Sequence, residues 1–152
     1  MLAKIVFNIF VMLLLLPFLM MAQGDPRFEL SEYRWENRLL LVFAPTQEHP
    51  LYKQQLDELN KEKAGMLERD LKVFHLFSED ASFGDGYQIN SETVKNLYRR
   101  YNADPNNYTI VLLGKDGTEK TRKSSLLTTE KLFTLIDSMP MRQREVRNQG
   151  DF

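Results

Sequence analysis

An unbroken apolar run constrains the fold of this chain more than any other feature of its sequence. The run extends from Leu39 to Phe43 and is closed by Ala44-Pro45. A strand with one face in water alternates apolar and polar residues, whereas a strand covered on both faces does not. The run therefore predicts the central strand of a largely parallel sheet, with other elements packed on both of its faces.

The next segments predict a helix and a second strand. Amphipathic spacing favours a helix over residues 48–64, with Gly65 as its C-terminal stop. The alternating, β-friendly segment 71–77 predicts a strand that is buried on both sides. His75 lies on its more apolar face, where a core imidazole with one satisfied hydrogen bond is favoured over a ligand.

A long connection and a second helix follow. Residues 78–90, with Gly84, Asp85 and Gly86 among them, predict a mobile surface loop. Asn90 or Ser91 can then cap a helix whose apolar side chains recur at helical spacing. That helix must end before Asp104-Pro105, because the residue before a proline disfavours helical backbone.

The last third of the domain predicts a hairpin and a helix. Residues 109–113 form an apolar strand, and residues 114–117 supply a tight turn into a polar strand over 118–123. Charges on that returning strand suit a sheet edge. A final helix, capped by Thr128 or Thr129, is expected to stop at Pro140.

This order of elements defines the expected fold class. The sequence predicts an α/β protein with the order β-α-β-α-β-β-α and a mixed central sheet flanked by helices. A parallel βαβ unit followed by an antiparallel hairpin and a helix, in about 110 residues, is the element order of the thioredoxin fold.

The chain divides into four expected regions. A basic start, an apolar stretch and Ala22 predict a signal peptide over residues 1–22 that is cleaved near Ala22, and hence an exported protein. Retention of this segment as a membrane anchor is the alternative. Residues 23–29 predict a flexible lead-in, 30–140 the thioredoxin-like domain, and 141–152 a polar, frayed tail.

Charge and cysteine content exclude several function classes. Removal of residues 1–22 takes away one of 20 basic residues and leaves a formal charge of −2, so no basic excess favours nucleic-acid binding. The 152 residues contain no cysteine, so disulfide exchange and thiolate catalysis are impossible for this chain. Its stability must come from the burial of apolar surface, without disulfides.

Several segments together resemble a known family. They are Trp35-Glu36-Asn37-Arg38 before LLLVFAP, Glu68-Arg69-Asp70-Leu71, the LLGKDG hairpin with Lys120 and Arg122, and the stretch from Ile136 to Arg142. The chain resembles the domain-of-unknown-function family 4174 over nearly all of its expected mature length. Similar domains, regarded as thioredoxin-like, occur in animal extracellular proteins that carry sushi repeats. The resemblance implies export and this fold, and it implies no catalytic residue or cofactor.

The fold analogy also shows what this chain lacks. It would place a redox cysteine in the loop after the first strand, where the start of a helix lowers the pKa of a thiol. Here that loop is residues 45–50, which contain no thiol. Thioredoxins carry a cis-proline before the third strand, whereas Asn107-Tyr108-Thr109 stands there in this chain. Activity inherited from the fold is therefore not expected.

Two groups of polar residues remain as candidate sites. Ligands of open α/β sheets bind outside the carboxyl ends of the parallel strands. Those ends predict a loop site of Thr46, Gln47, Glu48, His49, Glu79 and Asp80. A second candidate is a basic partner patch of Lys120, Arg122 and Arg142, joined by Arg144 and Arg147 if the tail folds back.

The sequence leaves two function hypotheses open. The preferred one is a non-catalytic interaction module that presents its strand-end loops and basic edge to an unknown protein of the periplasm or extracellular space. The alternative is a thiol-independent enzyme or metal-binding protein that uses Glu48, His49 and Glu79 or Asp80. No cofactor, nucleic acid or membrane contact of the mature chain is implied, and no metal ligand set is recognised.

Overall fold

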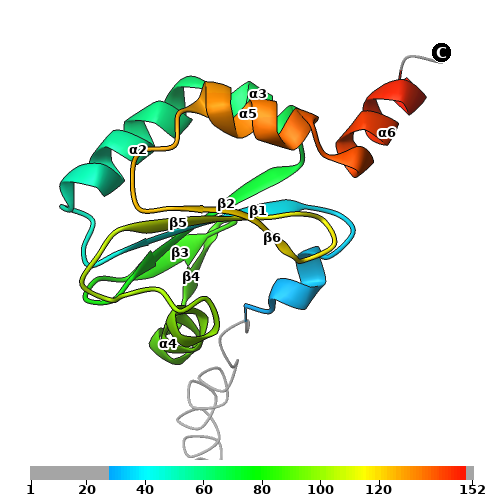
Figure 1. Ribbon diagram of the computed structural model, residues 1–152. Helices are drawn as coiled ribbons and strands as arrows, with labels where there is room; N and C mark the ends of the chain where they lie inside the picture. The colour runs from blue at the N-terminus through cyan, green and yellow to red at the C-terminus, as the bar shows by residue number, and fades with distance from the viewer. Residues whose placement is uncertain (1–27, 150–152) are drawn as a thin grey trace, which may run out of the picture.

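A computed structural model describes residues 28–149. The predicted signal peptide and most of the predicted lead-in lie outside the described residues. The described part is built on one six-stranded sheet with the strand order β4-β3-β2-β1-β5-β6, with helices on both of its faces (Figure 1). The predicted thioredoxin-like α/β architecture is confirmed.

The sheet is mixed, with one parallel pair at its centre. Strand β1 (Arg38–Ala44) runs parallel to β2 (Leu71–Phe77) and antiparallel to β5 (Thr109–Leu113). Strand β6 (Glu119–Lys123) pairs with β5 and forms one edge. All seven residues of β1 are buried, while four of the five β6 residues are exposed. The predicted central strand and the predicted charged edge strand are therefore both confirmed.

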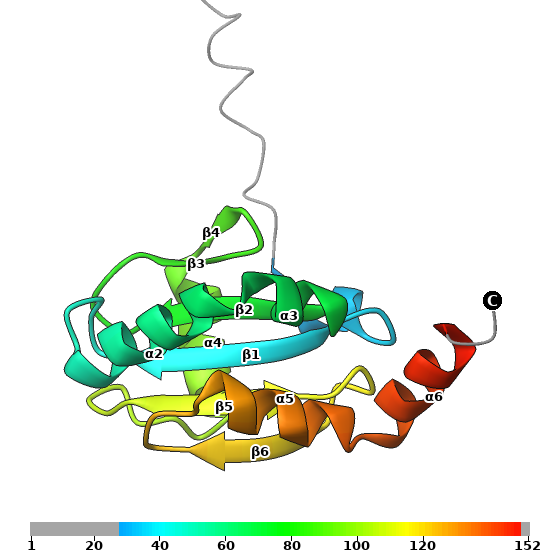
Figure 2. The same cartoon turned by 90° about the horizontal axis from the view of Figure 1, so that it is seen from above.

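Helices cover the two faces of the sheet unequally. One face carries α2 (Pro50–Lys61), α3 (Lys63–Glu68) and α5 (Thr129–Asp137), as Figure 2 shows from above. The other carries α4 (Ser91–Arg100) and the short 3-10 helix η2 (Leu30–Tyr33). Alternate β1 residues therefore enter two separate cores, with Leu41 packing on the α4 side and Leu40 on the α2 side.

The predicted helix caps are formed. The Asn90 side chain accepts a hydrogen bond from the backbone N–H of Thr93 at 2.8 Å, and Thr128 accepts one from Lys131 at 3.4 Å. Each cap satisfies one of the amide groups that have no partner within the first helical turn.

Gly65 does not end the first helical segment, in contrast to the sequence prediction. Helix α2 ends at Lys61, and the chain continues as α3 with Gly65 inside it. A Cβ at Gly65 would lie 2.5 Å from the Phe133 ring. The absence of a side chain therefore serves the close approach of α3 and α5, not a helix stop.

The predicted surface loop over residues 78–90 contains a hairpin. Strands β3 (Ser82–Gly84) and β4 (Tyr87–Ile89) extend the sheet beyond β2. Asp85 and Gly86, at the turn, both have positive φ angles, of 49° and 87°. That is the backbone of a two-residue hairpin turn, for which Asp-Gly is a favoured pair.

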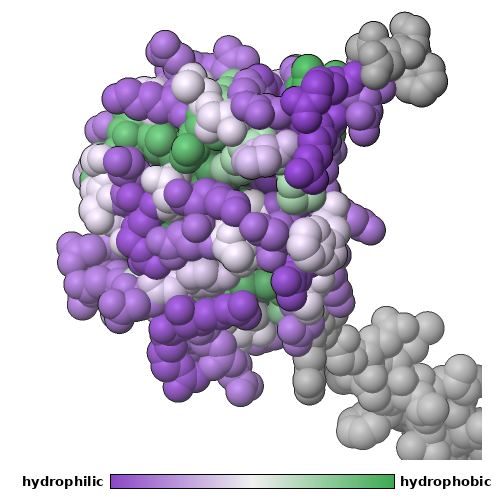
Figure 3. All heavy atoms as spheres, turned by 45° about the vertical axis from the view of Figure 1, so that its right-hand side comes forward, coloured by the Kyte–Doolittle hydropathy of each residue, from purple (hydrophilic) through white to green (hydrophobic). Residues whose placement is uncertain are grey.

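The C-terminal segment also differs from the frayed tail that the sequence predicts. Helix α5 does end before Pro140, but Pro140 begins a further helix, α6 (Pro140–Gln149). Proline is favoured at the first helical position because its missing N–H has no helical partner there. Figure 3 shows strongly hydrophilic side chains on α6, toward the top right of the view.

Two further observations bear on the predicted regions. Phe28, which the sequence places in the flexible lead-in, is buried against Phe74 in the α4-side core. Within residues 28–149, no helix has the length and apolar character needed to cross a membrane.

Candidate functional site

Two loops meet at the carboxyl ends of the parallel strands. The first joins β1 to α2, and the second follows β2. The backbone N–H of Gln47 donates to Asp80 Oδ2 at 2.8 Å, and the N–H of Glu79 donates to the carbonyl of Pro45 at 3.0 Å. The structure therefore brings the two halves of the predicted loop site together, through one backbone bond and one bond to the Asp80 carboxylate.

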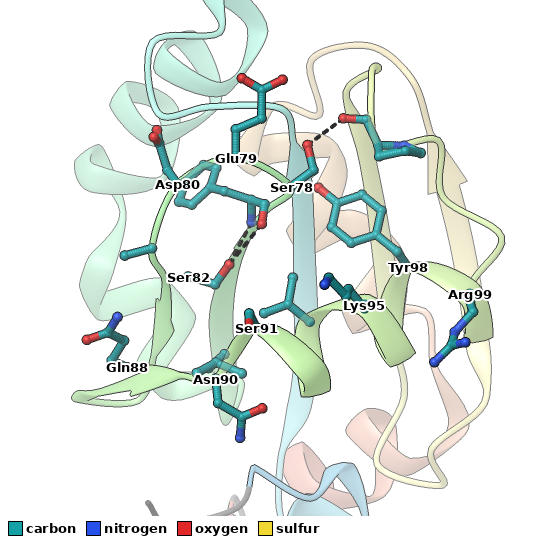
Figure 4. Close-up of a pocket in the computed structure, with 15 residues that line it drawn as sticks. Ser78, Glu79, Asp80, Ser82, Gln88, Asn90, Ser91, Lys95, Tyr98 and Arg99 are labelled. Carbon is teal, nitrogen blue, oxygen red and sulfur yellow. Dashed lines mark hydrogen bonds between the residues drawn. The ribbon is translucent and has the colours of Figure 1, made fainter.

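The side chains of this loop site have separate partners. Glu48 forms an ion pair with Lys53 on α2, Asp80 is engaged by Gln47, and Glu79 points away from α4 (Figure 4). Thr46 contributes its carbonyl, which accepts from the N–H of His49 at 3.3 Å. Within residues 28–149, no group of three or more His, Cys, Asp or Glu side chains could hold a metal ion.

His49 occupies the start of α2, where the fold analogy would place a thiol. Its side chain makes no capping hydrogen bond, and its ring stacks on Tyr108 with 6.1 Å between ring centroids. The Nδ1 atom is buried without a hydrogen-bond partner in the described structure. Tyr108 directly precedes β5, where thioredoxins carry a cis-proline, and no peptide bond of the described residues is cis.

A polar core contact holds this ring pair in place. The buried Tyr108 hydroxyl donates to Gln55 Oε1 at 3.1 Å, and burial raises the pKa of Tyr108. Gln55 is fully buried, and its amide exchanges two further hydrogen bonds with the backbone of Leu127, at 2.8 and 2.9 Å. The thiol position of the fold is thus filled by a packed imidazole above a satisfied hydrogen-bond network.

A cleft of about 790 Å³ opens beside the two loops. It lies between the end of β2, the β3–β4 hairpin and α4, and its buried apolar lining is Phe77, Ile89, Val94 and Tyr98. Figure 4 shows the residues that line it. Glu79 and Asp80 of the predicted loop site are among them, whereas Gln47, Glu48 and His49 are not.

Three hydroxyl groups in the cleft are used by the fold itself. Ser82 Oγ accepts from the N–H of Phe77 at 2.7 Å, and Ser78 Oγ donates to the carbonyl of Pro105 at 2.7 Å. The Tyr98 hydroxyl reaches the carbonyls of Ala44 and Leu76, at 2.9 and 3.0 Å. Burial raises the pKa of Tyr98 to about 12, further above neutral pH than its ordinary value of 10.0, so this hydroxyl is a donor in the protonated form.

The charged side chains of the cleft are less engaged. Lys95 and Arg99 come from α4 and have no carboxylate partner among residues 28–149, although Arg99 contacts the Asn96 side chain. Glu79 likewise has no side-chain partner in the described part, and Asp80 has only the Gln47 amide. The cleft thus combines an apolar lining, fixed hydroxyls and rim charges that have no ionic partner in the described part of the chain.

The basic residues singled out from the sequence are not gathered on one exposed edge. Lys120 pairs with Asp116 at 2.7 Å and Arg122 with Glu119 at 2.8 Å, both on the surface hairpin. The Arg142 side chain is only 2% exposed and pairs with Asp137 and Glu68. Arg142 is therefore an anchor for α6, while Arg144 and Arg147 lie exposed on the same helix.

Sequence reasoning did not find the cleft because its wall is the unpredicted hairpin. The Asp85-Gly86 pair was the available signal for that hairpin. The internal bonds of Gln55 and the burial of Arg38 and Arg142 carry no comparable signal, since polar and charged side chains usually face water.

Comparison of the fold with solved structures gives the class of protein. The structure is similar to that of the reduced 2-Cys peroxiredoxin of Plasmodium vivax, with a TM-score of 0.58 and 15% identity, over 75% of this chain and 83% of that one. It is also similar to StoA from Bacillus subtilis, with a TM-score of 0.50 and 18% identity, over 65% and 81% of the two chains. At these identities the likeness shows the fold alone, which is thioredoxin-like.

Sequence comparison then gives the family. The model of the family described as "Domain of unknown function (DUF4174)" matches residues 29–145, so the chain belongs to this family. It is 30% identical over 125 residues to the human Sushi repeat-containing protein SRPX and 29% identical over 136 residues to Coiled-coil domain-containing protein 80 of Danio rerio. These matches cover 80% and 79% of this chain but only 27% and 16% of the relatives.

Proposed function

We propose that this chain is an exported, thiol-free thioredoxin-like domain that acts as a non-catalytic interaction module. The observation that carries the proposal is the contrast at the carboxyl ends of β1 and β2. The helix start that the fold analogy assigns to a thiol holds a packed His49, and the chain has no cysteine. Beside it lies an open cleft of about 790 Å³, and charged side chains at its rim have no ionic partner among residues 28–149.

The relatives support an interaction role. The matched region forms about a quarter of a sushi repeat-containing protein, so there the domain is one part of a larger chain. A small domain without its own chemistry suits a binding task within such a chain. The apolar start of the present sequence, followed by Ala22, supports export.

Export is tested by the mass of the chain that its own host releases. The proposal expects a mature protein that begins at Gln23 and is found outside the cytoplasm. A cell-associated protein that retains residues 1–22 would contradict cleavage.

The binding role is tested with two charge reversals in the cleft. Mature wild-type chain and the double variant Glu79→Lys, Lys95→Glu are immobilised and exposed to the exported proteins of the host, with quantitative mass spectrometry as the readout. We expect proteins enriched by the wild type to be lost from the double variant and kept by Lys131→Glu, a matched exposed site on α5. Equal enrichment by all three chains would place binding elsewhere.

A further inference from the structure

We propose that the cleft between the β3–β4 hairpin and α4 binds an organic carboxylate with an apolar tail. This inference rests on the proposed function, because it names the ligand chemistry of the same cleft. The ligand is either a small free acid or the carboxyl terminus of a protein, and the chemistry that the cleft recognises is the same in both.

The size and lining of the cleft define the tail. Its volume of about 790 Å³ lies within the range of small-ligand pockets. Phe77, Ile89 and Val94 are each less than 5% exposed and form its apolar floor. The exposed residues Ala81 and Pro105 also line it and offer apolar surface to a ligand. An apolar tail would remove part of this surface from water, which is the main source of affinity in such pockets.

The hydroxyls leave few positions for a purely polar ligand. Ser78, Ser82 and Tyr98 already exchange hydrogen bonds with backbone groups of the surrounding strands and loops. A ligand could reach these hydroxyls only as a hydrogen-bond donor unless it displaced these bonds, because their protons are already committed to backbone carbonyls. The lining therefore favours a ligand whose polar part is confined to one end.

The charge distribution gives the sign of that polar end. In Figure 4, Lys95 lies over the middle of the cleft between Ser91 and Tyr98, whereas the Glu79 carboxylate points outward, away from α4. Lys95 has no carboxylate partner among residues 28–149, and Asp80 is held by the Gln47 amide at 2.8 Å. The side-chain charge that lies over the apolar lining in that view is thus the positive charge of Lys95, and Ser91 offers a hydroxyl beside it.

The experiment is a titration of the purified mature chain, labelled with ¹⁵N, followed by NMR. The probes are octanoate, its neutral analogue octanamide, and a short acetylated Leu-Leu peptide with either a free or an amidated carboxyl terminus. We expect octanoate or the free-acid peptide to bind with a millimolar or lower Kd and to shift amide signals of residues 77–82 and 88–99. Octanamide and the amidated peptide should bind at least threefold more weakly.

The matched variants are Lys95→Gln in the cleft and Lys131→Gln on α5, and both side chains are exposed, so neither change threatens folding. We expect Lys95→Gln to weaken octanoate binding about threefold to tenfold and Lys131→Gln to leave it unchanged. Tighter binding of the peptide acid would identify a protein terminus as the source, and tighter binding of octanoate a free acid.

Three results would overturn the inference: no shifts in the cleft with either acid, equal binding of acid and amide, or an unaltered Kd in Lys95→Gln. Such a result would leave the proposed interaction role standing if the Glu79 and Lys95 reversals still abolish protein enrichment. If the charge reversals do not change protein enrichment while octanoate still binds, the proposed protein partner is contradicted and the proposed ligand stands.

Discussion

The two ends of the parallel strand pair use their charges in opposite ways. At the amino ends of β1 and β2, Arg38, Arg69, Lys115 and Arg142 pair with Glu68, Asp70, Asp137 and Glu145; we call this group the closed end. At the carboxyl ends, the cleft and its loops form the open end, where Glu79, Lys95 and Arg99 have no ionic partner among residues 28–149. The closed end attaches α6 to the domain, and the open end is the face that the proposal assigns to binding.

The closed end explains how a polar helix remains attached to the domain. Arg142 is the one buried residue of α6 within the described range. The Arg38 side chain, 1% exposed, reaches both carboxylate oxygens of Glu145 at 3.1 Å and the carbonyl of Arg69 at 2.9 Å. Lys115 adds a second ion pair to Glu145 at 2.9 Å. Charges therefore take the place that apolar side chains occupy in the other helices.

The largest predicted effect comes from breaking the closed end. Arg142→Ala removes a buried cation and leaves Asp137 and Glu68 without it, so we expect the free energy of unfolding to fall by about 3 kcal/mol. Arg144→Ala, on the exposed side of α6, is the matched control and should change it by less than about 0.5 kcal/mol. Urea denaturation of both variants checks this, and equal losses would mean that α6 is not anchored by its buried arginine.

The pH dependence of stability distinguishes His75, in the sheet, from the carboxylates of the closed end. Burial lowers the pKa of His75 to about 4, from an ordinary value of 6.5. The unfolded chain therefore binds a proton between pH 6.5 and 4 that the folded chain does not, so stability falls as the pH is lowered through this window, by about 3 kcal/mol. The loss should be absent in His75→Gln, measured by denaturation at several pH values; an unchanged slope would contradict it.

Below pH 4, the carboxylates of the closed end should determine how stability changes with pH. Burial acts to raise the pKa of Asp137, but its hydrogen bonds and charge contacts with Arg69 and Arg142 outweigh burial and lower that pKa below the usual value of 3.8. Stability from Asp137 is then present above its unfolded pKa and is lost as the pH falls through the folded one. Asp137→Asn should flatten the stability curve below pH 4 only; flattening between pH 6.5 and 4 would contradict this assignment.

At the open end, a smaller effect is expected from the bond between the two loops. Asp80→Ala removes the acceptor of the Gln47 amide, and we expect a loss of about 1 kcal/mol in the free energy of unfolding. Glu79→Ala, one residue away with no side-chain partner in the described part, should be nearly neutral. A similar loss in both variants would mean that Glu79 has a structural role.

The smallest effect is predicted for the surface hairpin. Arg122 pairs with Glu119 at 2.8 Å, but both side chains are about one-third exposed. Arg122→Ala should therefore change stability by less than about 0.5 kcal/mol by thermal unfolding. A loss of stability as large as that of Arg142→Ala would contradict the expectation that buried arginines stabilise this fold more than surface arginines.

These two arginines also show how far sequence reasoning reached. The order of the main strands and helices followed from the apolar run at residues 39–43, the caps at Asn90 and Thr128, and the polar edge strand, because each is a local signal. Strands β3 and β4 and helices α3 and α6 were not predicted. Arg122 and Arg142 looked alike in sequence, since burial of an arginine depends on carboxylates that lie far away along the chain. Glu68, for example, is 74 residues from Arg142.

The candidate site was predicted in part, for the same physical reason. The strand-end rule located Glu79 and Asp80, which line the cleft. Lys95 was missed because its position in the cleft depends on the orientation of α4. The hairpin wall was missed because its turn resembled part of a loop. Local signals for the β3–β4 hairpin and for helix α6 were present, at Asp85-Gly86 and at Pro140. The polarity of the two segments nevertheless favoured the prediction of a loop and of a frayed tail.

The most direct test of the account is photo-crosslinking from one position at each end. A benzophenone amino acid is placed at Glu79 in the open end or at Glu36, an exposed residue beside the closed end, and the full chain is irradiated in its native host. We predict specific protein adducts from Glu79, which are reduced by the Lys95→Glu change, and none from Glu36. Adducts from Glu36 alone, or equally from both positions, would contradict the claim that the open end is the binding face.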